Sequence, residues 1–182
     1  MRGLVKGAVF ESEVSYTLEQ FERAIVISNL VLYSHYLESP TEIDKLIISP
    51  HGIFVVEVKS FSTSLHGRFS DEFWTGITGK TSTKIYSPVR QNFEHIRTLN
   101  NALHRIGGKF YPLENIVIVP DSSKINSDCN QVMNLSNFVS YFAGRSVEGI
   151  KFSDIKAMIS DLQEVVKQQS KNDIKSKNKS RR

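Results

Sequence analysis

The chain has 182 residues, of which 40% are hydrophobic and 23% are charged, and its formal net charge is +4. This composition is typical of a globular domain that buries its own core, and the single cysteine, Cys129, excludes an intrachain disulfide framework. No apolar run is long enough to span a membrane, and Glu11 and Glu13 are incompatible with a signal peptide. We therefore expect a cytoplasmic protein without a membrane partner.

The positive charge is concentrated at the C-terminus. Residues 171–182 contain six Lys or Arg against one Asp, which leaves the other 170 residues with a net charge of −1. The basic character of the whole chain therefore says nothing about nucleic-acid binding by its main part. Apolar residues nearly vanish from Gln169 onward, so we expect a globular domain over residues 1–168 and a disordered basic tail over residues 169–182.

The spacing of apolar residues predicts both helices and strands, because some segments repeat with the helical period and others are rich in Ile and Val. In chain order we expect a helix over 8–23, strands over 24–33, 41–48 and 53–60, short strands and loops over 61–86, a helix over 88–106, a strand over 115–119, and helices over 135–143 and 153–168. This order is typical of an α/β fold in which a central mixed sheet is flanked by helices.

The second and third strands form a hairpin that carries charged residues among apolar ones. Alternation places Glu57 and Lys59 on one face of an otherwise apolar strand, which is costly unless the charges are paired, hydrated or bound to a metal. A two-residue loop at 50–51 would set Asp44 directly opposite Glu57, whereas a bulge at Gly52 would shift the register by one residue. Both registers remain open at this stage.

Two carboxylates that meet without sulfur or paired histidines form a hard-oxygen site. Mg²⁺ or Mn²⁺ is the expected occupant, with waters and a backbone carbonyl completing its ligands. An adjacent ammonium can orient an attacking water or neutralise charge in the transition state, which suits phosphodiester hydrolysis. The alternative is an exposed salt bridge without chemical function, because Glu-x-Lys is a common pattern.

The two main helices offer further polar side chains. Glu11 lies beside the apolar stripe of the first helix, either as a solvated boundary residue or as a carboxylate aimed over the sheet. Arg90, Arg97 and Arg105 share the polar face of the helix after Pro88, which is either a plain solvent face or a phosphate-binding surface.

Four segments follow one another along the chain: KGAVFESEVSYTL, TEIDKLIISPHGIFVVEVKS, HGRFSDEFW and YSPVRQNFEHIRTL. In this order they resemble the nuclease-related domain (NERD) family, which is grouped with the PD-(D/E)XK, restriction-endonuclease-like superfamily. The resemblance covers roughly Lys6 to Leu103, and its most specific part is the hairpin with Glu-Ile-Asp and Glu-Val-Lys. The resemblance implies a restriction-endonuclease-like fold, in which Gly67 and Trp74 match structural positions.

The resemblance also implies roles for individual residues. Asp44, Glu57 and Lys59 match the catalytic triad of the superfamily, Glu11 matches the acidic residue of its first helix, and Gln91 matches the glutamine of the later helix. Asp44, Glu57 and the Val58 carbonyl would hold Mg²⁺ or Mn²⁺, with Glu11 in contact with the ion or just beyond. Lys59 would activate the water, and Gln91 would orient Lys59 or the scissile phosphate.

The function that follows from the resemblance is metal-dependent hydrolysis of nucleic acid, with DNA as the expected substrate and a homodimer as one arrangement. A second hypothesis is a module that holds nucleic acid through Arg90, Arg97, Arg105 and the tail without cutting it. A third is a protein-interaction domain in which Glu57 and Lys59 form only an ion pair.

Overall fold

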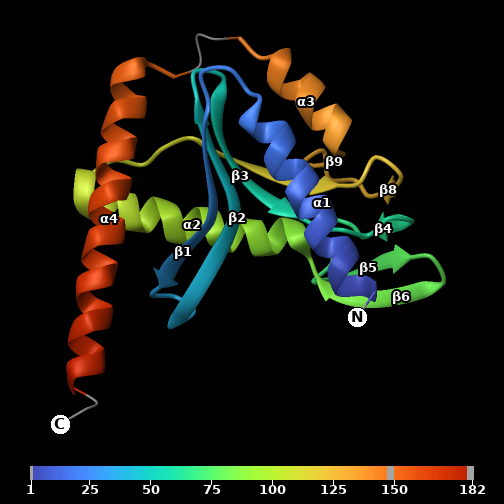
Figure 1. Ribbon diagram of the computed structural model, residues 1–182, viewed down its shortest axis with the longest axis horizontal. Coiled ribbons are helices and arrows are strands. Elements are labelled where there is room, and N and C mark those ends of the chain that lie inside the picture. The colour runs from blue at the N-terminus through green and yellow to red at the C-terminus, as the bar shows by residue number, and fades with distance from the viewer. Residues whose placement is uncertain (1, 147–149, 180–182) are drawn as a thin grey trace.

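A five-stranded mixed sheet lies at the centre of the protein, in the order β1-β2-β3-β7-β9 (Figure 1). The computed structural model describes residues 2–146 and 150–179. β1, β2 and β3 pair antiparallel, whereas β7 joins β3 in parallel and β9 joins β7 in parallel. The strands are β1 (Ile25–Ser34), β2 (Ser39–Ser49), β3 (Gly52–Val58), β7 (Leu113–Val119) and β9 (Val132–Asn134).

A second, four-stranded sheet lies beside the first, in the order β6-β5-β4-β8. It comprises β4 (Ser64–His66), β5 (Phe73–Thr78), β6 (Thr81–Tyr86) and β8 (Lys124–Asn126). The prediction of a mixed α/β fold is confirmed, and the short strands expected over 61–86 form most of this second sheet. β8 and β9 were not expected, because three residues are too few to display an alternating pattern.

Helices cover both faces of the central sheet (Figure 1). α2 and α4 pack on one face, and α1 and α3 pack on the other. Ser87 caps the start of α2 through its side chain, and Gly108 ends it with a left-handed φ of 66°. The helices are α1 (Arg2–Glu19), α2 (Pro88–Gly107), α3 (Leu135–Ala143) and α4 (Phe152–Lys179). None of the helices in the described residues is both long and apolar enough to cross a membrane.

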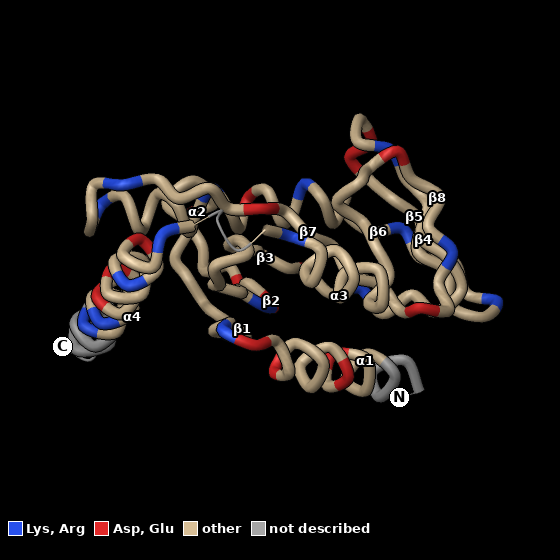
Figure 2. Tube along the Cα trace, turned by 90° about the horizontal axis from the view of Figure 1, so that it is seen from above, with Lys and Arg blue, Asp and Glu red and all other residues tan. Residues whose placement is uncertain are grey.

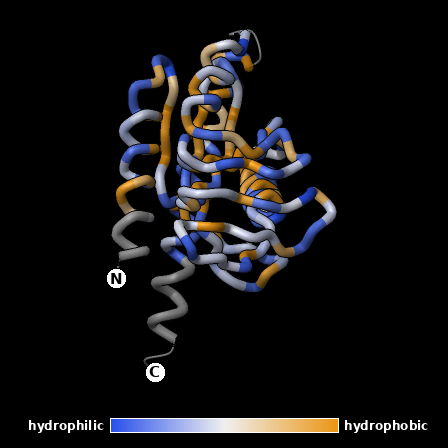
Figure 3. The backbone as a smooth tube through the Cα atoms, turned by 90° about the vertical axis from the view of Figure 1, so that its right-hand side faces the viewer, coloured by the Kyte–Doolittle hydropathy of each residue, from blue (hydrophilic) through white to orange (hydrophobic). Residues whose placement is uncertain are grey.

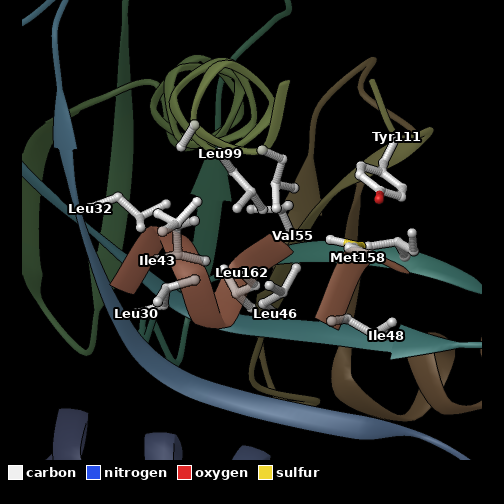
Figure 4. Close-up of a cluster of buried hydrophobic side chains, with 14 of the residues drawn as sticks. Leu30, Leu32, Ile43, Leu46, Ile48, Val55, Leu99, Tyr111, Met158 and Leu162 are labelled. Atoms are coloured by element: carbon white, nitrogen blue, oxygen red, sulfur yellow. The ribbon is translucent and has the colours of Figure 1, made fainter. Parts of the chain in front are cut away.

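Alternation along β2 and β3 divides the apolar residues into two cores, one on each face of the sheet. The core under α2 and α4 includes Leu46, Val55 and Leu99 (Figure 4), whereas Phe54 and Val14 belong to the core under α1 and α3. Apolar residues accordingly concentrate in the strands between the helices (Figure 3). All seven residues of β3 are buried, so this strand is the most enclosed part of the sheet.

Gly67, directly after β4, makes a close contact with Trp74 of β5 within the second sheet. A Cβ atom at Gly67 would lie 2.2 Å from the indole ring, which no real packing allows. The indole is 1% exposed, and its N–H donates to the Arg68 carbonyl at 3.1 Å. Both residues therefore have the structural role that the sequence resemblance implies.

Three helix boundaries differ clearly from the sequence prediction, and the first is the start of α1, which lies at Arg2 rather than at residue 8. α1 ends at Glu19 rather than at residue 23. The backbone hydrogen bonds of the next residues span three residues instead of four, and Arg23 adopts a left-handed φ of 58°. α4 continues to Lys179, so residues 169–179 are helical where the sequence predicts a disordered tail. No Gly or Pro interrupts this stretch, and the Gln169 amide faces the backbone of β1. Residues 180–182 of the predicted tail lie outside the described residues.

Candidate active site

The β2–β3 hairpin brings the predicted carboxylates together. Its pairs run from Ser49 opposite Gly52 to Lys45 opposite Val56, so the loop contains only residues 50 and 51. One further step in this register sets Asp44 opposite Glu57, which is the first of the two predicted alternatives. Asp44 uses its Oδ2 atom to accept a hydrogen bond of 2.7 Å from the Val58 amide, and this fixes the side chain against the end of β3.

Lys59 follows the last residue of β3 and connects the hairpin to α2. Its Nζ atom lies 2.6 Å from Glu57 Oε1 and donates to Gln91 Oε1 at 3.2 Å. The Glu57 side chain is 2% exposed, whereas that of Lys59 is 22% exposed. The ammonium is therefore held by two partners and can still be reached from solvent.

The surroundings of the two carboxylates favour their protonated forms. The pKa of Glu57 is raised to about 7, mainly by burial and also by the nearby charge of Asp44, while Lys59 and Gln91 act in the opposite direction. Burial also raises the pKa of Asp44, against the lowering effect of the Val58 amide and of Lys59. Two partly uncompensated carboxylates at one point are a site to which a cation would be attracted.

His95 is a further polar side chain at the same point, and no role was predicted for it from the sequence. It lies one helical turn after Gln91 on α2, and its Nδ1 atom is 3.6 Å from Glu57 Oε2. Burial and the charge of Lys59 lower the pKa of His95 to about 4. Both Nδ1 and Glu57 Oε2 are buried without a hydrogen-bond partner.

Asn92 fixes the part of α2 that carries Gln91 and His95. Its side-chain amide is fully buried and donates to the Val55 carbonyl at 2.7 Å and to Asn115 Oδ1 at 2.9 Å. The Asn115 amide in turn donates to the Val89 carbonyl at 2.9 Å. These hydrogen bonds link α2 to β3 and β7, and they hold the start of the helix next to Glu57.

Asn92 and His95 could not be recognised as buried from the sequence, because hydrophobicity alone places polar residues on the exposed face of an amphipathic helix. In the structure the apolar Phe93 is 42% exposed and contacts Phe69, whereas the polar Asn92 and His95 are buried. The spacing of four residues between Gln91 and His95 was the available signal, because it places both side chains on one face of the helix.

Glu11 lies on α1, which covers the opposite face of the sheet from Glu57. Its side chain is exposed, and its charge contributes a minor part of the raised pKa of Asp44. Within the described residues, no three His, Cys, Asp or Glu side chains lie close enough together to hold a metal ion. Asp44 and Glu57 therefore form a two-carboxylate site, and Glu11 stands apart from it.

The three predicted arginines of α2 all make contacts within the chain. Arg90 donates to the Ser70 carbonyl at 2.9 Å, and Arg105 donates to the Asn101 carbonyl at 3.2 Å. Arg97 pairs with Glu94, and its guanidinium lies 3.5 Å from the centre of the Tyr36 ring. The contacts of the three arginines leave further N–H groups for a ligand.

Other helices carry charges of a different pattern. Figure 2 shows acidic residues along α1 and residues of both signs along α4.

The raised pKa of Glu57 leads to a prediction about stability without any metal. The folded state holds the Glu57 proton more tightly than the unfolded state, so this contribution to stability is complete below pH 4.5 and is lost as the pH rises through about 7. Glu57→Gln removes the titration. In a chelator, we expect the difference in the free energy of unfolding between the variant and the natural protein to change in favour of the variant as the pH rises from 4.5 to 8. The expected change is on the order of 1–3 kcal/mol.

Urea unfolding of both proteins across this pH range measures the difference. Parallel pH dependences of the two unfolding free energies would show that the Glu57 carboxyl titrates normally. Glu22→Gln is a matched control, because Glu22 is an exposed glutamate outside the site, and it should reproduce the natural profile.

Comparison with known proteins identifies relatives of this sequence. Residues 6–120 match the family described as the nuclease-related domain. A stretch of 74 residues is 30% identical to an uncharacterized protein of Bacillus anthracis, and it covers 41% of this chain. The match spans only about a third (34%) of that relative's length. No solved structure matches the chain.

Proposed function

This chain belongs to the nuclease-related domain family, and on that premise we propose that it is a metal-dependent nuclease that hydrolyses phosphodiester bonds of DNA. The observation that carries the proposal is the convergence of Asp44, Glu57 and Lys59 at the end of one hairpin, with Gln91 of α2 held against the ammonium. An ordinary surface ion pair would not be built on the most buried strand of the sheet.

The donor set fits Mg²⁺ or Mn²⁺. Asp44 and Glu57 are hard oxygen ligands, and burial raises the pKa of both, so a divalent ion would favour their ionised forms. Asp44 uses only Oδ2 for the Val58 amide, which leaves Oδ1 for another partner. We assign Asp44, Glu57 and the Val58 carbonyl as the protein ligands, with Glu11 acting through its charge or through a water.

When bound, the ion would polarise the phosphate and lower the pKa of water. The chain's own residues would do the rest. Lys59, partly exposed at the edge of the site, would donate hydrogen bonds to the attacking water and to the phosphate oxygens on which negative charge develops. Gln91, which accepts from Nζ at 3.2 Å, would keep the ammonium in that position.

The polar face of α2 supplies a surface for the nucleic acid outside the site. Arg90, Arg97 and Arg105 would contact phosphates along the backbone, which carries no sequence information. The basic segment over residues 171–182 would add contacts that weaken with salt. A homodimer is the arrangement we propose for cutting both strands of a duplex.

The test uses single-stranded and double-stranded DNA and RNA, each with Mg²⁺, Mn²⁺ or a chelator. We expect cleavage of DNA by the natural protein with either metal and none in the chelator, and Glu57→Gln purified in parallel controls for contaminating nucleases. Binding of nucleic acid without cleavage in any metal would overturn the proposal in favour of a silent binding module. Neither binding nor cleavage would favour a protein-interaction domain.

A further inference from the structure

His95 and Glu57 place two buried, unpartnered polar atoms against each other. The imidazole is 4% exposed and the carboxylate 2% exposed, and the distance from Nδ1 to Oε2 is 3.6 Å. Neither atom has a hydrogen-bond partner, although leaving a buried polar atom unpaired destabilises a folded protein. The pair is therefore an arrangement that needs an explanation beyond packing.

We propose that His95 is a positioning residue for Glu57, whose Oε2 atom accepts a hydrogen bond from the protonated Nδ1 of the imidazole. Lys59 already contacts the other carboxylate oxygen, so the two residues together would hold the carboxylate in one orientation. This inference rests on the proposed function, in which Glu57 binds the metal. A carboxylate with both oxygens anchored still has lone pairs for a cation.

The chemistry of the two groups selects one tautomer. An ionised carboxylate can only accept hydrogen bonds, so Nδ1 must carry the proton for the contact to be attractive. With the proton on Nε2, the Nδ1 lone pair would face the Oε2 lone pairs at 3.6 Å without compensation. The contact needs to shorten by about 0.5 Å to become a normal hydrogen bond, and active-site contacts commonly tighten in this way when a ligand binds.

The position of His95 suits this role because α2 is fixed on both sides of it. Asn92 lies three residues earlier and ties the helix to β3 and β7, and Leu99 lies four residues later in the core. The backbone that carries the imidazole is therefore held in a fixed place relative to β3 and Glu57. A residue that only filled space at this point could be aliphatic, whereas a positioning residue must have a donor at the place of Nδ1.

Three substitutions at His95 separate the two roles. The amide nitrogen of Asn reaches the place of Nδ1, that of Gln reaches the place of Nε2, and Leu fills the volume without any donor. By titration calorimetry with Mn²⁺, we expect His95→Leu and His95→Gln to weaken metal binding about tenfold or more, and His95→Asn to stay within about threefold of the natural protein. His104→Leu, which removes an exposed histidine of the same helix, is the matched control and should leave the affinity unchanged.

A second measurement reads the tautomer in the natural protein and needs no bound metal. Above pH 8, where Glu57 with its pKa of about 7 is ionised, long-range proton–nitrogen NMR correlations should show His95 with its proton on Nδ1, and Glu57→Gln should shift that proton signal. Equal Mn²⁺ affinities for the Asn, Gln and Leu variants, or a proton on Nε2, would overturn the inference. Absence of Mn²⁺ binding by the natural protein would instead overturn the proposed function, and the tautomer would still decide the role of His95.

Discussion

Asp44→Asn is expected to reduce metal-dependent cleavage by on the order of 10³-fold at saturating substrate. The ion contributes several kcal/mol of charge stabilisation, and each 1.4 kcal/mol corresponds to about a factor of ten in rate. The amide of Asn is neutral and a poor substitute for one of two carboxylates. Single-turnover cleavage assays with Mn²⁺ measure the chemical step directly, and calorimetric titration with Mn²⁺ should show a parallel loss of affinity.

The fold should survive this substitution. The carbonyl of the Asn side chain can still accept the hydrogen bond from the Val58 amide, and removal of a charge from a buried pair relieves repulsion with Glu57. We expect the melting temperature in a chelator to be equal to or above that of the natural protein. A large drop in melting temperature would mean that Asp44 holds the fold together rather than a metal.

Glu42→Gln is the matched control for Asp44→Asn. Glu42 is an exposed carboxylate two residues earlier on β2, and its charge also contributes to the raised pKa of Asp44. Its removal changes the charge near the site without removing a proposed ligand, so cleavage should stay within about threefold of the natural rate. An equal loss of activity in both variants would show that general charge, rather than ligation by Asp44, is what matters.

Lys59→Ala is expected to reduce turnover by on the order of 10²–10³-fold while it leaves Mn²⁺ affinity nearly unchanged. An ammonium donates hydrogen bonds and cannot be a metal ligand, and positioned proton donors and acceptors contribute about 10²–10⁴-fold to rates. Lys59 also lowers the pKa of Glu57, so the substitution raises that pKa further. Metal binding should therefore be compared at pH 9, where Glu57 is ionised in both proteins.

One outcome would reverse the roles assigned to Lys59 and Glu57. If Mn²⁺ binding collapses in Lys59→Ala while Glu57→Gln binds the ion normally, the lysine supports the metal and the glutamate does not. Lys84→Ala is a suitable control, because Lys84 is an exposed lysine on β6 that contacts the Phe73 ring and has no part in the site.

The hairpin was predictable because its signal is short-range. Two apolar strands around a loop containing Pro50 and His51 define a register, and the register alone brings Asp44 towards Glu57. Sequence spacing could not decide between a two-residue loop and a bulge, because both keep the same alternation on either side. The contact of Lys59 with Gln91 crosses between elements, so only the family resemblance indicated it.

The parts that escaped prediction depend on tertiary contacts. Asn92 and His95 are polar residues on an amphipathic helix, where hydrophobicity favours an exposed position, and their burial follows from partners on β3 and β7. β8 and β9 are strands only because they pair with β4 and β7, which are distant from them in sequence. α4 extends beyond Gln168 because neither Gly nor Pro stops it.

The place of β3 between β2 and β7 has a consequence for the order in which the protein is made. On the ribosome, the hairpin and the start of α2 are complete before Leu113–Val119 is synthesised, so β3 has only one neighbouring strand for that period. Its other edge is open to water or to a second chain until β7 arrives. Glu57 therefore becomes fully enclosed late in synthesis, after every other side chain of the site has been made.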